Sequence, residues 1–90
     1  MAATVPGAEE KVKQISALMD VVVGDTSIPK NVRKSVSEAK EKLSSNEELI
    51  VKTSAAVYLL EEISSDINLP AHARTQIWTL LSALEGIREQ

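Results

Sequence analysis

The sequence predicts an all-α protein, a four-helix up-down bundle built from two helical hairpins. Its composition favours helix over sheet, because Gly and Pro occur only three times each while Ala, Leu, Glu and Lys are abundant. Apolar residues recur every three or four positions along most of the chain, which is the spacing of one helical face. Finally, the second half of the chain repeats the pattern of the first half at an offset of 41 residues.

The first helix is predicted over about Ala8–Val23, and residues 1–7 before it are expected to be disordered. Its apolar face contains Val12, Ile15, Met19 and Val22. Gly24 follows this face and is expected to end the helix in the left-handed conformation that glycine adopts most easily. The turn "DTSIP" then leads to Pro29, which is predicted to open the second helix.

The second helix has a narrow apolar stripe, made by Val32, Val36, Ala39 and Leu43. Beyond it, Ser45 and Glu48 have the spacing of a capping box, in which the serine side chain caps the start of the next helix. We therefore expect a very short turn and antiparallel packing between the second and third helices.

The third helix carries a wider apolar arc than the second, and the fourth helix is predicted to open at Pro70 after the turn "SSDIN". Both stripes keep the three- and four-residue steps of a buried helical face. The predicted core of the bundle consists of Leu18, Val22, Val36, Leu43, Leu59, Leu60, Ile63, Ile77, Leu80 and Leu84.

The internal repeat is clearest in the turns between paired helices. A shift of 41 positions superposes three identical pairs, Asp25/Asp66, Pro29/Pro70 and Arg33/Arg74. We therefore predict one domain over residues 8–90, with the first hairpin at about 8–44 and the second at about 45–90. A period of about forty residues with an Asp–turn–Pro–Arg signature resembles the HEAT type of helical repeat.

Two segments carry a closer resemblance to a known family. The segments "DTSIPKNVRKSVSEAK" and "AAVYLLEEISSDINLPAHARTQIW", and within the latter "LPAHART" and "IW", resemble a family of small archaeal proteins of about this length, catalogued as an uncharacterised protein family. The resemblance covers the chain from the first helix to its end. It implies an all-helical bundle and brings no established activity, so it carries no functional residue over to this chain.

Composition also bounds the function. The chain has no cysteine, which excludes disulfides, thiolate zinc sites and cysteine nucleophiles, and it shows neither a secretory signal nor a long apolar run. We expect a cytoplasmic protein without a membrane segment. No phosphate loop, nucleophile elbow or paired histidine is present, so we predict no enzyme activity, no cofactor and no metal, and we identify no known small molecule as a ligand.

Asp25 and Asp66 are the first candidate functional positions. Each precedes an arginine by eight residues across a turn, Arg33 and Arg74 respectively. We interpret the two aspartates as a structural turn lock, in which each carboxylate accepts backbone N–H groups at the start of the following helix and pairs with an arginine across or between the repeats. The alternative is that the aspartates belong to a binding site.

The starts of the second and fourth helices form the second candidate site. Lys30, Arg33 and Lys34 crowd a helix start, where the helix dipole favours acidic side chains, and the repeat places His72 and Arg74 at the equivalent helix start. A bound anion would relieve this repulsion, so a phosphate, an acidic peptide or an RNA backbone is a candidate ligand. The alternative is a solvated basic face balanced by acidic neighbours, and the net charge of −3 does not favour a dedicated nucleic-acid binder.

Tyr58, Trp78 and Leu81 form the third candidate site, on the outer side of the third and fourth helices. A helical tryptophan is often buried, but tryptophan is also enriched among interface anchors, so both interpretations stay open. Ser37 is the equivalent of Trp78 in the first hairpin, which favours exposure. The predicted function is a non-enzymatic protein-interaction module that acts with a protein partner or by self-association.

Overall fold

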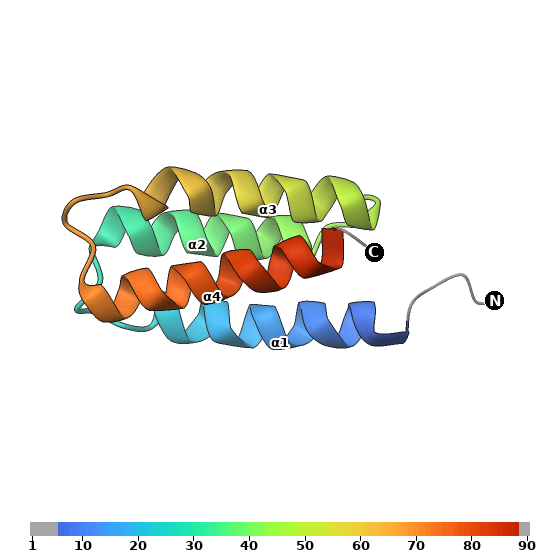
Figure 1. Cartoon of the computed structure of the whole chain (residues 1–90), viewed down its shortest axis with the longest axis horizontal. Helices are drawn as coiled ribbons and strands as arrows, with labels where there is room; N and C mark the ends of the chain where they lie inside the picture. The colour runs from blue at the N-terminus through green and yellow to red at the C-terminus, as the bar shows by residue number, and fades with distance from the viewer. Residues whose placement is uncertain (1–5, 89–90) are drawn as a thin grey trace.

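The computed structural model describes residues 6–88 and confirms the all-α, four-helix fold. The helices are α1 (Pro6–Val23), α2 (Lys30–Leu43), α3 (Leu49–Ser64) and α4 (Ala71–Arg88). They run alternately up and down (Figure 1). The α1–α2 and α3–α4 turns therefore lie at one end of the bundle, which we call the turn end. Of the predicted disordered segment, residues 1–5 lie outside the described residues, and α1 begins two residues before its predicted start.

Prolines open α2 and α4, as predicted. Pro29 precedes α2 with φ −53° and ψ 145°, and its carbonyl accepts hydrogen bonds from the N–H groups of Val32 and Arg33. The carbonyl of Pro70 accepts the N–H of Arg74 at 2.9 Å in the same way. A proline suits this position because its missing N–H would have no partner within the helix.

Gly24 does not adopt the predicted left-handed conformation, and no residue of the described range 6–88 has a positive φ of that kind. Its N–H still donates to the carbonyl of Asp20 at 3.0 Å, which continues the pattern of α1. The next N–H, that of Asp25, donates to Val22 at 3.1 Å instead. This tighter step ends the helix, so the chain reaches the turn without a left-handed residue.

The predicted capping box before α3 is also wrong. The helix begins at Leu49 after Glu48, and no side chain caps its start. Ser45 is still engaged at the end of α2, where its N–H donates to the carbonyl of Lys42 at 3.1 Å. Its hydroxyl instead accepts the N–H of Glu47 at 3.4 Å. A capping box with Ser45 as N-cap needs a helix that begins at residue 46, whereas α3 begins only at Leu49.

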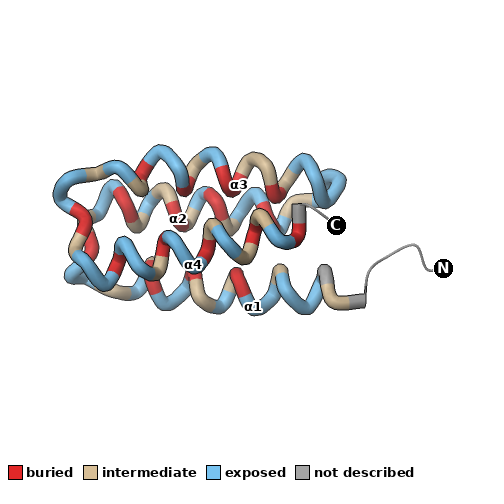
Figure 2. Tube along the Cα trace, viewed as in Figure 1, coloured by how far each residue is buried: buried red, intermediate tan, exposed pale blue. Residues whose placement is uncertain are grey.

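The core lies between four helices arranged in a ring. α1 contacts α2, α2 contacts α3, α3 contacts α4, and α4 contacts α1. The helices that are equivalent in the repeat, α1 with α3 and α2 with α4, lie diagonally opposite one another. Figure 2 shows the buried positions along the inner sides of all four helices. Stacked repeats of the HEAT type place each hairpin beside the next, and the closed ring here is a different arrangement. A HEAT-like origin of the two hairpins stays a prediction.

Two predicted core residues, Leu18 and Leu59, are only partly buried. They are repeat equivalents, and each directly precedes a residue with no exposed surface, Met19 or Leu60. One step along a helix turns a side chain by about 100°, which moves it to the edge of the apolar stripe. The other eight predicted core residues are buried.

The structure also buries residues that the sequence reasoning left out of the core. Ile28 and Leu69 are again equivalents and lie in the two turns, with 1% and 5% of their surface exposed. Their signal was their matching position in the repeat, which preserves an apolar residue just before each helix-opening proline. These side chains close the apolar core at the turn end.

The difference between the two adjacent leucines gives a direct test of this packing. We expect Leu60→Ala to lower the free energy of unfolding by about 2–5 kcal/mol, because it leaves a cavity in a fully buried position. Leu59→Ala is the matched control, with a loss of about half that value or less. Urea unfolding followed by circular dichroism measures both, and equal losses would contradict the observed burial.

Candidate functional site

The two turns at the turn end share one hydrogen-bonding pattern. The N–H of Ile28 donates to the carbonyl of Asp25 at 3.1 Å, and the N–H of Leu69 donates to that of Asp66 at 3.2 Å. The side chains repeat the match, because Oδ1 of Asp25 accepts the N–H of Ser27 at 2.9 Å. Oδ1 of Asp66 likewise accepts the N–H of Asn68 at 2.8 Å. Each aspartate therefore organises its own turn through the residue two positions later.

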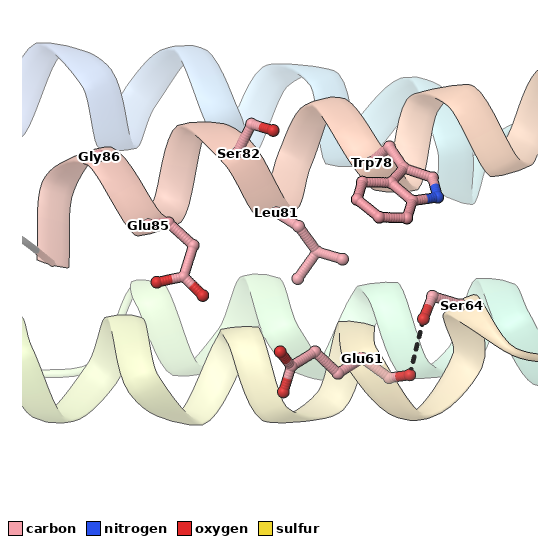
Figure 3. Close-up of a pocket in the computed structure, with 7 residues that line it drawn as sticks. All are labelled: Glu61, Ser64, Trp78, Leu81, Ser82, Glu85 and Gly86. Carbon is pink, nitrogen blue, oxygen red and sulfur yellow. Dashed lines mark hydrogen bonds between the residues drawn. The ribbon is translucent and has the colours of Figure 1, made fainter.

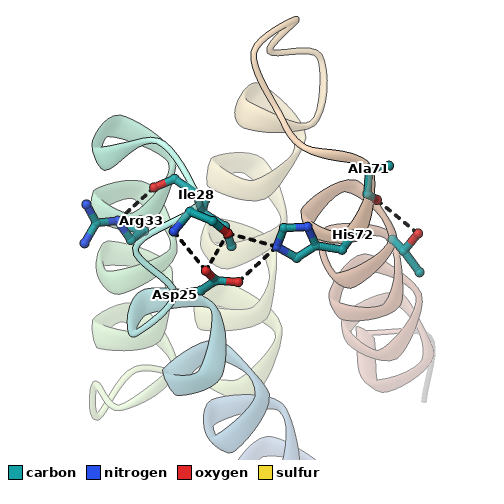
Figure 4. Close-up of polar contacts among 7 residues, drawn as sticks. Asp25, Ile28, Arg33, Ala71 and His72 are labelled. Carbon is teal, nitrogen blue, oxygen red and sulfur yellow. Dashed lines mark hydrogen bonds and ion pairs between the residues drawn. The ribbon is translucent and has the colours of Figure 1, made fainter.

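The second oxygen of each aspartate crosses to the other hairpin. Oδ2 of Asp25 lies 3.0 Å from Nε2 of His72, and Oδ2 of Asp66 accepts from Nδ2 of Asn31 at 3.0 Å. His72 and Asn31 are repeat equivalents, each the second residue of its helix. Reciprocal contacts of this kind are those of an approximate two-fold relation between the hairpins. We call these four residues the crossed junction, and Figure 4 shows its Asp25–His72 half.

The role of the histidine follows from the partner that it contacts. An ionised carboxylate can only accept hydrogen bonds, so Nε2 of His72 donates to Asp25. The hydroxyl of Ser27 lies 3.3 Å from the same nitrogen and donates to Oδ1 of Asp25 at 2.6 Å. His72 therefore takes part in a polar contact between the hairpins, whereas Asn31 makes the equivalent contact with an uncharged amide.

The predicted pairing of each aspartate with an arginine does not form. Nε of Arg33 donates to the carbonyl of Ile28 at 3.0 Å, and the guanidinium of Arg74 reaches the carbonyl of Leu69 at 3.5 Å. The two arginines thus hold equivalent carbonyls just before the helix-opening prolines. The aspartates accept N–H groups within the turns rather than at the helix starts, and each also contacts a side chain of the opposite hairpin.

Hydrogen bonds hold the pKa of both aspartates below its ordinary value. For Asp25 the largest cause is the Ser27 hydroxyl, followed by the Ser27 N–H and by His72. For Asp66 the largest cause is the Asn68 N–H, followed by the Asn31 amide. All of these groups donate to the charged carboxylate and so favour it over the protonated form.

The five predicted anion-binding residues do gather at the turn end, but three of them already have partners there. Arg33 and Arg74 hold turn carbonyls, and His72 contacts Asp25. Lys30 and Lys34 have exposed side chains. Two ionised aspartates share this end of the bundle, so its local charge is mixed. These contacts weigh against an anion site, which stays a prediction.

The predicted interface residues divide into two groups. Trp78 and Leu81 line a groove of about 490 Å³ between α3 and α4, whereas Tyr58 is exposed on α3 outside it. Trp78 has 62% of its surface exposed and is therefore not a core residue. The lining of this α3–α4 groove consists of Glu61, Ser64, Trp78, Leu81, Ser82, Glu85 and Gly86.

Figure 3 shows how the groove is built: Leu81 and Glu85 point from α4 toward α3, and Glu61 lies across from them on α3. Trp78 lies one turn away from Leu81 on the same helix. Neither glutamate is among the predicted site residues. A signal was available for Glu85, because Trp78, Leu81 and Glu85 follow the three- and four-residue spacing that places side chains on one helical face.

Two other kinds of site have no counterpart among residues 6–88. Within that range, no three or more side chains of His, Asp or Glu gather closely enough to hold a metal ion. Neither is any helix of the described part of the chain long and apolar enough to cross a membrane.

The shifted aspartates predict a specific dependence of stability on pH. At neutral pH we expect Asp25→Ala and Asp66→Ala each to lower Tm, because each removes a turn acceptor and a contact between the hairpins. The folded-state pKa of each carboxyl lies below its unfolded value. The ionised form therefore adds stability above the unfolded value, and this gain disappears as pH falls through the folded value.

The difference in Tm between the parent and each variant should then narrow below about pH 4. Thermal melts over a pH series measure it. Asp20→Ala is a suitable control, because Asp20 is an exposed aspartate whose partner Lys40 lies outside the turns. A difference in Tm that persists unchanged into acid would show that the charged carboxylates do not hold the turns.

The comparisons with known proteins agree along nearly the whole chain. The model of the uncharacterised protein family UPF0147 matches residues 1–87. A UPF0147 protein from Methanocaldococcus jannaschii is 42% identical over 81 residues, which are 89% of this chain and 87% of the relative. Another from Pyrococcus furiosus is 45% identical over 82 residues, covering 89% of this chain and 88% of the relative.

Two solved structures share the fold. The crystal structure of a UPF0147 protein from Thermoplasma acidophilum has a TM-score of 0.87 and 36% identity, covering 92% of this chain and 99% of that one. The crystal structure of MMP1188, a protein described as of unknown function, has a TM-score of 0.83 and 42% identity, covering 86% of this chain and 89% of that one. The resemblance to a small archaeal family is confirmed, and the chain belongs to the uncharacterised protein family UPF0147.

Proposed function

We propose that this protein is a non-enzymatic protein-interaction module that docks a partner protein in the α3–α4 groove. The observation that carries the proposal is Trp78, which leaves 62% of its surface exposed beside this groove. A tryptophan buries a large apolar area when a partner covers it, and tryptophan is enriched among the residues that dominate binding energies. A partner protein that covers Trp78 would bury this exposed apolar surface.

The walls of the groove suit rigid docking. Trp78 and Leu81 stand on α4 beside Ile77 and Leu80, both of which are completely buried in the core. The opposite wall stands on α3, which packs directly against α4. A partner would therefore meet side chains on two packed helices rather than on loops, and little conformational entropy would be lost on binding.

The distribution of titratable groups supports a binding role rather than catalysis. Hydrogen bonds in the turns hold the pKa of Asp25 and that of Asp66 below the ordinary value. Both act as hydrogen-bond acceptors in the turns, and neither lines the α3–α4 groove. Acid–base catalysis uses groups tuned to the reaction at the site where the substrate binds.

A photo-crosslinking experiment tests the proposal. A photoreactive phenylalanine derivative in place of Trp78 should yield a covalent adduct with a protein in an extract of an archaeon that makes a UPF0147 protein. The matched control carries the same derivative in place of Ser37, the equivalent position of the first hairpin. We expect no adduct from the control, and nuclease treatment should leave the adduct from position 78 intact.

Other outcomes identify other functions. An adduct with twice the mass of the chain would indicate self-association, and an adduct lost with nuclease would indicate contact through RNA. Equal adducts from both positions, or none from either, would contradict docking in the α3–α4 groove.

The exposure of Trp78 gives a further prediction that needs no partner. Trp78→Ala should change the free energy of unfolding by less than about 1 kcal/mol, because the side chain is mostly outside the core. In the parent protein, the tryptophan emission should be that of a solvated indole and should be quenched readily by iodide. A blue-shifted, unquenched emission from a monomer would show that Trp78 is buried.

A further inference from the structure

The two hairpins differ most clearly at the positions equivalent to the α3–α4 groove. In the first hairpin, Asp20 on α1 and Lys40 on α2 form an ion pair, with Nζ and Oδ1 2.5 Å apart. The 41-residue offset places Glu61 at the position of Asp20 and Leu81 at the position of Lys40. The second hairpin therefore also has an acidic residue at the first position, but it has an apolar residue where the first hairpin has a basic one.

Trp78 is part of the same difference between the hairpins. Its equivalent in the first hairpin is Ser37, a half-buried residue on α2 one turn before Lys40. In the first hairpin, an ion pair on the surface thus joins the two helices. In the second hairpin, a tryptophan, a leucine and a carboxylate line an open groove between the helices instead. Among the side chains that the structure describes, Glu61 forms no ion pair.

We infer that the α3–α4 groove receives a lysine or arginine side chain of a partner protein, which takes the place that Lys40 occupies in the first hairpin. This inference rests on the proposed function and specifies the chemistry of the partner. The partner residue would pack its aliphatic stem on Leu81, place its cationic head beside Glu61 and lie against the face of Trp78.

Each part of the groove matches a part of such a side chain. Long basic side chains cover apolar surface with their methylene groups while the charged head stays near polar groups. The face of an indole attracts a cation more strongly than that of any other aromatic side chain. Glu61 adds negative charge from α3, across the groove from Leu81 on α4, as Figure 3 shows.

The same charges argue against a second copy of this chain as the occupant of the groove. In a symmetric dimer, a surface patch faces its own copy across the two-fold axis. Such a dimer would bring Glu61 of each copy toward an acidic groove, and like charges across an interface disfavour association. A basic segment of another protein has the complementary charge.

A peptide selection tests the inference on the full-length chain. Short random peptides are displayed and selected on the immobilised parent protein, and peptides that also bind the Trp78→Ala variant are discarded. We expect the remaining peptides to share a lysine or arginine next to an apolar residue. Replacing that basic residue with methionine should weaken binding at least about tenfold, the loss typical of an anchor residue.

Three variants of the protein then locate the basic side chain. Glu61→Gln should weaken binding of the selected peptides about fivefold, because it removes the charge of an exposed ion pair. Leu81→Lys should weaken binding at least as much, because it gives the second hairpin its own cation beside Glu61, as Lys40 is beside Asp20 in the first hairpin. Leu81→Met should bind like the parent. Asp20→Asn is the control on the first hairpin and should leave binding unchanged.

The results separate this inference from the proposed function. Selected peptides without a basic residue, or binding that Glu61→Gln leaves unchanged, would overturn the inference while docking beside Trp78 stands. If no peptide binds the parent in preference to Trp78→Ala, both the inference and the proposed function are wrong.

Discussion

Each hairpin of this protein exposes one apolar stripe per helix, and neither hairpin can bury its stripes alone. This constraint determines the architecture, because two such hairpins bury all four stripes when they close on one another as a ring. The internal repeat makes the closure nearly symmetric: equivalent residues such as Met19 and Leu60 reach the same depth. The turn end is then tied by reciprocal polar contacts, in which each aspartate accepts from a helix start of the opposite hairpin.

Much of this fold could be predicted from the sequence, because the 41-residue repeat and the helical spacing each identify the same four helices. The partners of Asp25 and Asp66 could not. A repeat says that the two turns have the same environment, but it does not say whether an aspartate contacts its own hairpin or the other one. The prediction paired Asp25 with Arg33 within one hairpin, whereas the observed partner of Asp25, His72, is 47 residues away.

The candidate site lies where the two halves of the repeat depart from one another. The repeat accounts for the turns and the core, because equivalent residues there are buried alike and make the same turn hydrogen bonds. It does not account for the exposed Trp78 at the position equivalent to Ser37, nor for Leu81 at the position equivalent to Lys40, where the first hairpin has an ion pair. Helical spacing alone could not decide whether Trp78 is buried. That depends on how the neighbouring helices close around it, which only the structure shows.

The two hairpins are joined crosswise at the turn end. Double-mutant cycles of alanine variants test it most directly, with urea unfolding as the measurement. Asp66 with Asn31, and Asp25 with His72, should each show a coupling free energy clearly different from zero. The pairs within one hairpin, Asp25 with Asn31 and Asp66 with His72, should be additive within error. Coupling within the hairpins but not between them would contradict the crossed junction.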